Sequence, residues 1–427
     1  MSGKLALHWQ MLIAMVLGGL LGLLMNNGAI PAAPALTSTL DVIAQLFMNS
    51  LKLLVIPVVV TSMIVGISRI DSGIGKLGGY TLLYYVASST AAIIAGLFFV
   101  NLLSPGLVDG VAVGSHIALP ADAGALMQKV ENRGAGDMLN LFLSMLPPNL
   151  VTAASEGNLL GLIVFSLLYG YFLGRLPTEQ KQSQLAFWES AQAIVMGIAT
   201  LFLRAAPIGV FALIANVLAR TGFAAMAPMA WFFVTVVLAL AFHLGVTLSF
   251  LLWQVAKASP RQHFRAMLPA LLTAFSTASS NATLPVTLRC LRERAGVSER
   301  VSGMTVPLGA TINMDGTALY ECAAVLFLAQ AYGVDLSFAQ QLTVVIIALV
   351  TSIGVAGIPA ASLVAIAIIL GAVGLPLEAI GLLLITDRLL DMCRTAVNVY
   401  SDSVAAVFVA SREGEQLSPP DSHSASD

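Results

Sequence analysis

Charged residues are scarce in this chain. Asp, Glu, Lys and Arg make up 10% of its 427 residues, whereas a typical soluble domain contains about 25%. The formal net charge is only −2, so the chain has no basic surface of the kind that binds nucleic acid. The composition therefore argues against a water-soluble protein and predicts no nucleic-acid partner.

Cysteine and histidine are also rare, with three and five copies in the chain. Disulfide frameworks and zinc sites need these residues at short, regular spacings. Cys290, Cys322 and Cys393 are far apart, and the histidines are scattered. We therefore expect no disulfide framework, no metal site built on these residues, and no cofactor.

Apolar residues fill most of the remaining sequence and make up 58% of the chain. A helix needs about 20 residues to cross ~30 Å of hydrocarbon. Apolar runs of about this length occur at residues 11–26, 43–67, 80–103, 158–174, 190–218 and 228–256. They predict an all-α polytopic membrane protein, surrounded by a lipid bilayer and with about eight transmembrane helices.

Arginine and lysine are distributed unevenly between the predicted loops. No small-residue cleavage site follows the first apolar run, which predicts a retained helix with a cytoplasmic N-terminus. Counting spans from there places only Lys129, Arg133 and Arg220 outside, as the positive-inside rule requires. The rule holds as far as Arg412 only if residues 262–292 enter and leave on the cytoplasmic face. The sequence thus predicts a multi-pass protein of the plasma (inner) membrane with both termini cytoplasmic.

Residues 262–292 have the length and polarity of a re-entrant helical hairpin. About 11 residues of apolar helix before Ser276 span roughly 16 Å, half of a bilayer. The polar tip from Ser276 to Asn281 is expected to be unwound, which is tolerated at membrane depth only where the backbone lines protein or water. The alternative is a cytoplasmic loop between two short helices.

A second segment, residues 337–373, repeats this design with a tip from Ser352 to Ser362 that is rich in Gly, Ala and Pro. A long helix with a polar interruption follows each hairpin, at residues 302–330 and 376–411. Because the two hairpins are expected to open toward opposite sides, the two units form an inverted repeat. In secondary transporters this arrangement places the substrate site near the middle of the bilayer.

The polar residues of the segment 376–411 lie on one helical face. At 100° per residue they fall within an arc of about 100°; they are Asp387, Asp391, Arg394, Thr395, Asn398 and Asp402. An amphipathic helix at a water surface is the alternative, but the apolar residues between them favour a membrane span. Ionisable groups inside a span are costly and mark a substrate or ion path.

Carboxylates outnumber arginines in the two polar helices. The acidic residues are Asp315, Asp387, Asp391 and Asp402, and the basic ones are Arg394 and Arg388, which lies off the polar face. Buried carboxylates must be paired, protonated or bound to cations. Small hard cations prefer oxygen ligands, which Asn313, Asn398 and the carbonyls of interrupted helices can supplement. The surplus of carboxylates therefore predicts binding of inorganic cations.

Arg394 and Asp391 together fit an acidic amino acid. A guanidinium binds a carboxylate through two parallel hydrogen bonds, and Asp391, about one turn away, can accept hydrogen bonds from an ammonium group. A plain dicarboxylate would leave Asp391 without this partner. The alternative is a structural Arg394–Asp391 ion pair at i,i+3.

Four ordered motifs connect the chain to a known family. They are SSNATLP at 279–285, GATINMDGT at 309–317, the Gly/Pro tip from Ser352, and the segment from Asp391 to Asp402. With these motifs the sequence resembles, over residues 8–411, the dicarboxylate/amino acid:cation symporter family, which includes the glutamate transporters.

The resemblance implies a homotrimer in which each protomer transports alone. Helices near 43–67, 138–174 and 187–219 would form a fixed scaffold, and the remainder would move across the membrane as an elevator. In chain order, residues 1–257 would hold the N-terminal helices with the trimerisation scaffold, and residues 258–411 the transport core. Residues 412–427 are polar and rich in Pro and Ser, which predicts a disordered cytoplasmic tail.

The resemblance also assigns residues to sites. For the substrate it implies Ser279, Ser280, Thr317, Gly357, Ile358, Asp391, Arg394, Thr395 and Asn398. For cations it implies three groups, which are Gly309, Asn313, Asn398 and Asp402, then Thr311, Met314, Ser352, Ile353 and Val355, and finally Tyr85, Ser88, Ser89, Asn313 and Asp315. The assignment of Tyr85 and the two serines is the weakest, because such residues in an apolar helix usually just pack.

Three positions depart from patterns found in the family. Ala278 stands where some members have arginine, and Ala360 and Ser362 replace glycines of the second tip. The added side chains in the second tip are expected to stiffen it or to reshape the pocket.

The expected function is secondary active symport of aspartate or glutamate with sodium as the co-transported ion. Symport of neutral amino acids or C4-dicarboxylates, coupled to protons, is the alternative within the family. A channel fits tips that enter from both sides less well. An enzyme is not expected, because no histidine lies near Ser279 and Ser280 in the sequence, and the nearest, His263, is placed at the membrane surface.

Overall fold

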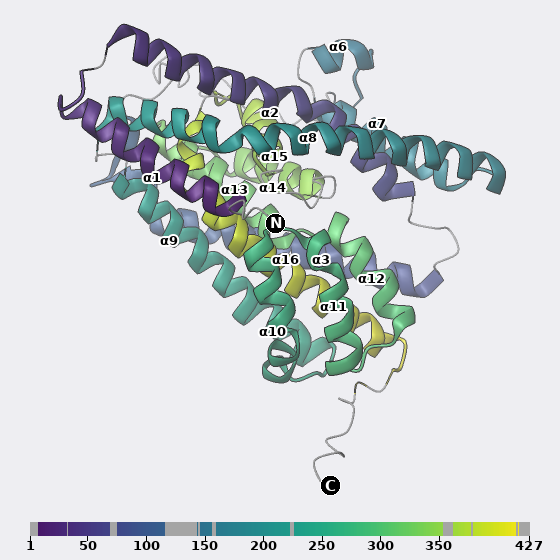
Figure 1. Ribbon diagram of the computed structural model, residues 1–427. Helices are drawn as coiled ribbons and strands as arrows, with labels where there is room; N and C mark the ends of the chain where they lie inside the picture. The colour runs from purple at the N-terminus through teal and green to yellow at the C-terminus, as the bar shows by residue number, and fades with distance from the viewer. Residues whose placement is uncertain are drawn as a thin grey trace, which may run out of the picture.

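Helices dominate the structure, a computed structural model that describes residues 7–31, 33–68, 75–115, 143, 146–155, 159–222, 226–352, 362–376, 379–415 and 417 (Figure 1). The α-helices are α1 (Leu7–Asn26), α2 (Pro34–Ser68), α3 (Gly75–Leu103), α6 (Leu150–Ser155), α7 (Leu159–Gly174), α8 (Thr178–Thr221), α9 (Met226–Phe242), α10 (Pro260–Thr277), α11 (Ser280–Arg294), α12 (Glu299–Ile312), α13 (Asp315–Ala331), α14 (Phe338–Ser352), α15 (Ser362–Val373) and α16 (Ile380–Arg412). Shorter helical segments are the 3-10 helix η1 (Val113–Ser115) and the π-helical η3 (His243–Leu248) and η4 (Leu251–Val255). Among the described residues the only sheet is an antiparallel pair of two-residue strands, β1 (Leu107–Val108) and β2 (Val111–Ala112). The predicted all-α class is confirmed.

Several of these helices have the length and composition of membrane spans. Within the described ranges, five stretches are long and apolar enough to cross a bilayer, and they are Trp9–Asn26, Leu77–Leu103, Thr178–Phe202, Met226–Val255 and Glu299–Ala331. Shorter apolar helices occur at Ile56–Ser68, Gly161–Gly174 and Phe338–Ser352. α16 is 33 residues long but carries several charged residues. The total of about eight spans stays a prediction.

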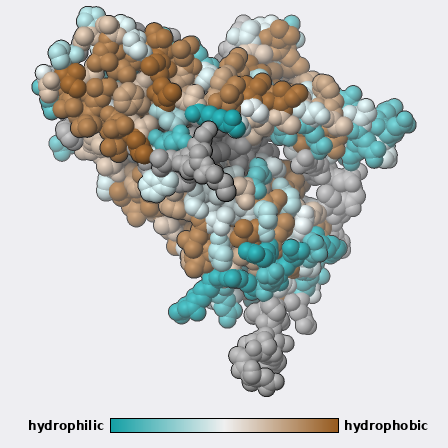
Figure 2. Space-filling model, in the orientation of Figure 1, coloured by the Kyte–Doolittle hydropathy of each residue, from teal (hydrophilic) through white to brown (hydrophobic). Residues whose placement is uncertain are grey.

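The surface is divided between apolar and polar regions (Figure 2). Apolar residues cover the upper left, over α1 and the adjoining parts of α2 and α8, and polar residues gather around α10 to α12 and at the right-hand end, where α8 begins. On α8, large side chains such as Phe187, Ile194 and Leu201 are 61–65% exposed. Exposure of this extent is unfavourable in water and ordinary against lipid tails.

Helices α1, α2 and α8 form one layer of the molecule (Figure 1). Two glycines of α1 allow close approach to α8. A Cβ atom added at Gly18 would lie 2.5 Å from the carbonyl oxygen of Phe211, and one added at Gly22 would lie 2.5 Å from that of Ala215. Small residues at such crossings let membrane helices pack closely.

Helix α13 is the buried centre of the other layer. Nearly all of its residues, from Asp315 to Ala331, are buried, and α3, α9, α14, α15 and α16 all contact it. Phe232 of α9 stacks on Phe327 of α13 with 4.4 Å between ring centroids. A helix surrounded in this way by apolar contacts holds the polar residues at its N-terminal end in a fixed position.

Helices α10 and α11 pack against each other as a hairpin. Their junction is shorter than the predicted unwound tip from Ser276 to Asn281, and that part of the prediction is wrong. Ser276 and Thr277 end α10, and Ser280 already begins α11. Ala278 adopts the left-handed conformation, at φ 48° and ψ 41°, and Ser279 caps α11 by accepting a bond from the Ala282 N–H. This pair of cap conformations reverses the chain within two residues.

The second predicted hairpin is described only in its two arms, α14 and α15, which contact each other. Residues 353–361 lie outside the described residues. The assignments of Ile353, Val355, Gly357 and Ile358, and the departure at Ala360, therefore fall outside the part that the structure describes.

The two polar helices differ in their backbone. Residues 302–330 are interrupted between α12 and α13, where Asn313 and Met314 have ψ values of 80° and 62°. By contrast, α16 runs unbroken from Ile380 to Arg412. The polar interruption predicted between Asp387 and Asp402 therefore consists of side chains on a continuous helix and involves no break in the backbone.

The chain remains ordered just beyond α16. Glu413 forms an ion pair of 2.7 Å with Arg300, and Glu415 accepts a bond of 3.1 Å from the backbone N–H of Ser298. The predicted tail at 412–427 is thus wrong in its first residues, which these contacts hold against the start of α12. Residues 418–427 lie outside the described residues.

Candidate functional site

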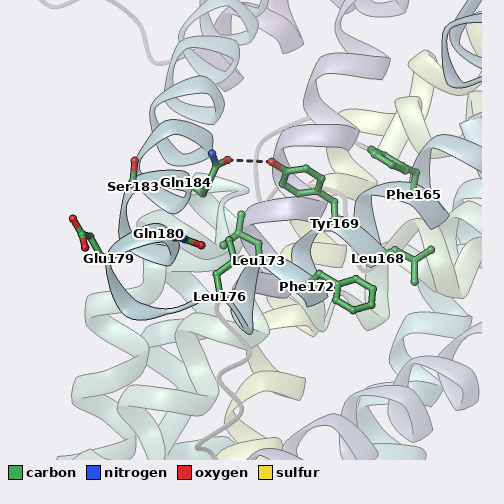
Figure 3. A pocket seen from close by; sticks show the side chains of 10 residues that line it. All are labelled: Phe165, Leu168, Tyr169, Phe172, Leu173, Leu176, Glu179, Gln180, Ser183 and Gln184. Atoms are coloured by element: carbon green, nitrogen blue, oxygen red, sulfur yellow. Dashed lines mark hydrogen bonds between the residues drawn. The ribbon is translucent and has the colours of Figure 1, made fainter.

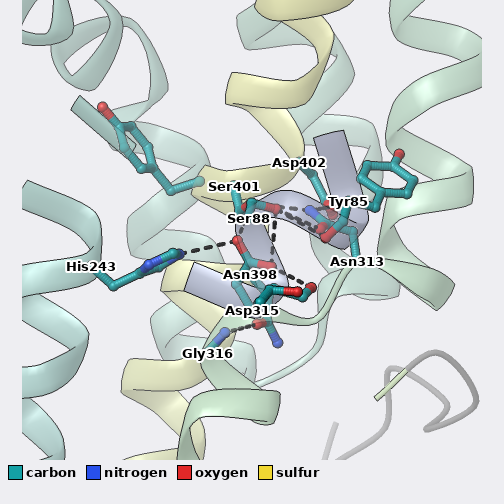
Figure 4. A network of polar contacts seen from close by, with 12 residues as sticks. Tyr85, Ser88, His243, Asn313, Asp315, Gly316, Asn398, Ser401 and Asp402 are labelled. Atoms are coloured by element: carbon teal, nitrogen blue, oxygen red, sulfur yellow. Dashed lines mark hydrogen bonds and ion pairs between the residues drawn. The ribbon is translucent and has the colours of Figure 1, made fainter. Parts of the chain in front are cut away.

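Asp315, the first residue of α13, lies in a fully buried polar cluster (Figure 4). Its Oδ1 accepts bonds from Ser88 at 3.2 Å and Ser89 at 2.7 Å. Its Oδ2 accepts one from Ser401 at 2.6 Å and lies 3.1 Å from Nε2 of His243. Four elements that are distant in the sequence, α3, α9–η3, α13 and α16, therefore meet at one carboxylate.

The structure brings together most of the third predicted cation group at this point. Ser88 also donates to Oδ1 of Asn313 at 3.3 Å, so the two serines do more than fill space. Tyr85 differs, because its hydroxyl donates to the carbonyl oxygen of Thr305 at 2.6 Å. Its ring lies edge-on to Tyr84, as expected for a packing residue.

Asp402 of α16 lies beside the break between α12 and α13. Its Oδ1 accepts a bond of 3.0 Å from Nδ2 of Asn313, and its carboxylate fills the space that a Cβ atom at Gly309 would occupy. Asp402 is only 1% exposed, and it takes part in none of the ion pairs found in the described part of the chain. A buried carboxylate with only a neutral amide partner is unfavourable unless a cation or proton joins it.

Asn398 fastens α16 to the start of α13. Its Oδ1 accepts bonds from the backbone N–H groups of Gly316 at 2.8 Å and Thr317 at 3.4 Å, and its Nδ2 donates to the Thr317 hydroxyl at 3.0 Å. This side chain thus satisfies free N–H groups of a helix N-terminus. These bonds occupy Oδ1 and one N–H of Nδ2, so the second N–H of the amide and the backbone carbonyl are the groups of Asn398 that a ligand could use.

Arg394 lies about two turns before Asp402 on α16 and is 1% exposed. Its Nη2 contacts Asp391 at 3.0 Å and Asp387 at 3.2 Å, and its guanidinium carbon lies 3.9 Å above the ring of Tyr320. The structural ion pair that was the alternative interpretation is therefore present. However, Nε and Nη1 have no hydrogen-bond partner among the described residues, so part of the guanidinium is available to a ligand.

Arg388 belongs to the same charged group, although helical periodicity places it off the polar face. It is 8% exposed, and its Nη1 contacts Oδ2 of Asp391 at 3.3 Å. Its position off the polar face thus does not prevent the long side chain of Arg388 from reaching a carboxylate one turn away.

Two buried ionisable residues were missed by the sequence interpretation. Glu321 is fully buried in α13, accepts a bond of 3.1 Å from Thr351, and has its Oε1 without a partner in the described part of the chain. His243, the partner of Asp315, is also fully buried. The rule that selected Asp315, an ionisable residue inside an apolar span, applies equally to both and would have found them.

Other predicted hydroxyl groups bond within their own helices. Thr395 donates to the Asp391 carbonyl at 2.7 Å, Thr311 to Leu308 at 2.9 Å and Ser352 to Leu349 at 2.9 Å. Ser280 is 5% exposed at the start of α11, which contacts α16, and Met314 is buried at the helix break. Of these residues, Thr395 bonds to a member of the charged group, through the backbone carbonyl of Asp391.

A surface pocket of about 940 Å³ lies elsewhere, between the end of α7 and the start of α8 (Figure 3). Phe165, Tyr169 and Phe172 line it together with polar residues of α8, and Tyr169 donates to Gln184 at 3.1 Å. None of the predicted site residues lines this pocket, so the candidate site remains the polar interior around α13 and α16.

Comparison with known proteins identifies the family of the chain. Residues 7–412 match the model of the sodium:dicarboxylate symporter family. The chain is 32% identical to the proton/glutamate-aspartate symporter of Escherichia coli (strain K12), with 96% of this chain and 93% of the relative covered. It is 33% identical to the proton/sodium-glutamate symport protein of Bacillus subtilis (strain 168), with coverages of 96% and 94%, and 33% identical to the mouse excitatory amino acid transporter 3, with coverages of 97% and 87%. The chain is therefore a membrane transporter and not an enzyme, and it belongs to the sodium:dicarboxylate symporter family.

Proposed function

We propose that this protein is a secondary active symporter that takes up aspartate or glutamate together with sodium ions. The observation that carries the proposal is the separation of charge along α16. Arg394 offers unpartnered nitrogens at one point, and Asp402 lies buried without a basic partner among the described residues at another. The similar proteins of E. coli and B. subtilis are named as glutamate symporters, which supports the same substrate class here.

The cation sites are proposed at the two buried carboxylates near the helix break. Asp315 and Asp402 supply charge, and Asn313, Ser88 and Ser89 supply neutral oxygens. Hard cations are bound by such oxygen sets, and the carbonyls freed where α12 ends can complete them. Sodium is cargo in this scheme, and no cofactor is proposed.

The substrate site is proposed about two to three turns along α16 from Asp402, around Arg394 and Asp391. Arg394 would bind the side-chain carboxylate through the nitrogens that lack partners. Asp391 would accept from the ammonium group. Ser279, Ser280, Thr317 and the second tip, including Gly357 and Ile358, would line the rest of the pocket.

A specific observation favours protons as an additional coupling ion. Glu321 is a fully buried carboxylate whose only hydrogen bond in the described part of the chain comes from Thr351. No basic side chain forms an ion pair with it there, so a proton is the simplest partner that removes its charge. Proton-coupled symport is therefore the second candidate.

We further propose that the two hairpins, α10–α11 and α14–α15, are re-entrant and related as inverted repeats. In α10 to α12, the exposed arginines at the open end of the first hairpin, including Arg261, Arg292 and Arg300, would mark the cytoplasmic side of the plasma membrane. The C-terminus would lie on that side, and so would the N-terminus.

The domain arrangement is proposed from the packing. The apolar outer surface of α8, together with α2 and α7, would form the scaffold of a homotrimer. Helices α3 and α9 contact α13, so they would move with residues 258–411 as an elevator. Although α3 and α9 precede residue 257, we therefore do not assign them to the scaffold.

Uptake into proteoliposomes tests the proposed function. Purified protein would be given labelled aspartate, glutamate, succinate and alanine under an inward sodium gradient, an inward proton gradient, or neither. We expect aspartate or glutamate to accumulate when the sodium gradient is present. Accumulation of alanine alone, or of no substrate under any gradient, would reject the proposal.

The change of Asp391 to Asn tests the ammonium site. The variant keeps the shape of the side chain but loses the charge that faces the ammonium group. Hydrogen bonds to a charged partner contribute about 1.5–3 kcal/mol, so affinity for aspartate and glutamate should fall roughly 10- to 100-fold. Succinate has no ammonium group and should be affected much less. Equal losses for succinate and aspartate, measured by competition for uptake, would remove the argument for an amino acid carrier.

The change of Gly309 to Ala tests the cation site beside Asp402. The new Cβ would lie 2.7 Å from Cγ of Asp402 and 2.9 Å from the Tyr85 hydroxyl, so the carboxylate has to shift. Overpacking costs about 1–3 kcal/mol, and the sodium concentration for half-maximal uptake should rise roughly tenfold. Gly303→Ala, on the same helix but with nothing within 4 Å of its added Cβ, is the matched control. An equal sodium dependence in both variants would count against the site.

A further inference from the structure

Asp391 is held between two arginines. Its Oδ1 lies 3.0 Å from Nη2 of Arg394, and its Oδ2 lies 3.3 Å from Nη1 of Arg388. The three side chains are 9%, 1% and 8% exposed, so water screens their charges weakly. The carboxylate proposed to receive the substrate ammonium therefore already has a positive group at each oxygen.

The contact made by Arg388 is looser than the contacts expected of a structural arginine. Buried arginines that hold a structure together usually bind carboxylates through two parallel hydrogen bonds. Arg388 contributes one contact at 3.3 Å, and its Nε has no hydrogen-bond partner among the described residues. Arg388 therefore brings a positive charge to the site, but its hydrogen bonds do not fix its guanidinium in one position.

The charge of Arg388 opposes an incoming ammonium group. Asp387, Asp391, Arg388 and Arg394 carry formal charges that sum to zero, so the group is neutral as it stands. An ammonium at Asp391 would be a third cation beside two guanidiniums, and like charges repel strongly in a buried site. A dicarboxylate without an ammonium group meets no such repulsion, and both arginines attract it.

We propose that Arg388 is a specificity-determining residue that competes with the substrate ammonium for Asp391. It lowers the advantage of acidic amino acids over plain dicarboxylates, so that the protein binds both classes. The inference rests on the proposed function, since it assumes that substrate binds at Arg394 and Asp391. It adds to that function a second substrate class, the plain dicarboxylates, which Arg388 favours.

The test compares variants that remove or keep the positive charge. Affinities for L-aspartate and succinate would be measured in proteoliposomes of Arg388→Met and Arg388→Lys, by competition with labelled substrate at fixed pH and saturating sodium. In Arg388→Met the ratio of the two affinities should shift toward aspartate by roughly tenfold or more, the size of a charge-assisted contact. In Arg388→Lys, which keeps the charge, the ratio should stay within about threefold of wild type.

Two further variants keep the result decisive. Arg388→Gln removes the charge but keeps an N–H donor, and it replaces the Met variant if that one does not fold. Arg220→Met breaks an exposed arginine–aspartate pair with Asp41, away from the site, and should leave the ratio unchanged. An unchanged ratio in both neutral variants, an equal shift in Arg388→Lys, or a parallel loss of both substrates would overturn the proposal. If wild-type protein binds neither substrate, the proposed function fails first, and this inference fails with it.

Discussion

Replacing Arg394 by alanine is expected to abolish uptake of aspartate and glutamate. Arg394 is the buried arginine whose Nε and Nη1 lack partners among the described residues, so its loss removes the group proposed to bind the substrate carboxylate. Breaking a buried charge pair costs about 3–5 kcal/mol, which corresponds to at least ~100-fold in affinity. Uptake of labelled aspartate at several concentrations measures the effect.

Replacement of Arg394 by alanine should also lower the stability of the fold. Arg394 also pairs with Asp387 and Asp391, so the alanine variant leaves two buried carboxylates without this partner and should be less stable. Arg394→Lys keeps the charge and loses the planar fork, and it should retain the fold while losing most of the affinity. Arg412→Ala, at the exposed end of the same helix, is the control. Unchanged aspartate affinity in a folded Arg394 variant would show that the substrate carboxylate binds elsewhere.

The change of Asp402 to Asn is expected to weaken the dependence of substrate binding on sodium. The amide occupies nearly the same volume and can still accept the bond from Asn313, but it lacks the charge that attracts a cation. The sodium concentration for half-maximal substrate binding should rise roughly tenfold or more, because a contact with a charged group contributes about 1.5–3 kcal/mol.

Thermal unfolding separates this effect from a packing defect. Removal of a buried unpaired charge should leave stability without sodium unchanged or higher. The increase in unfolding temperature on adding sodium should be smaller in the variant than in the wild type, because a ligand that binds more weakly stabilises the folded state less. Asp335→Asn, at an exposed aspartate, is the control. Normal sodium stabilisation in Asp402→Asn would place the cation elsewhere.

Much of the site was predictable because it follows short-range rules. Helical periodicity brought Asp387, Arg394 and Asp402 to one face of α16, and all are buried. A polar stretch in an apolar helix predicted the break at Asn313, which the structure confirms. These features depend on residues within a few turns of each other, which the sequence displays directly.

The remaining features depend on contacts between distant segments. The bond between Ser88 and Asp315 joins residues 227 positions apart, and that between His243 and Asp315 joins residues 72 apart. No local pattern encodes such pairs, and only the resemblance to a family suggested the serines. The narrow turn at Ala278 was missed for another reason, because alanine in a left-handed conformation has no clear sequence signal.

Cation and substrate binding are proposed to be coupled through the neighbouring sites on α13 and α16. Coupling is reciprocal, so sodium must raise substrate affinity by the same factor as substrate raises sodium affinity, and about 1–3 kcal/mol per linked step is typical. Calorimetric titration of wild-type protein with aspartate at stepped sodium concentrations, at fixed pH and ionic strength, measures this coupling directly. We expect the dissociation constant of aspartate to fall steeply as the sodium concentration rises. A dissociation constant independent of sodium would contradict it and leave protons as the driving ion.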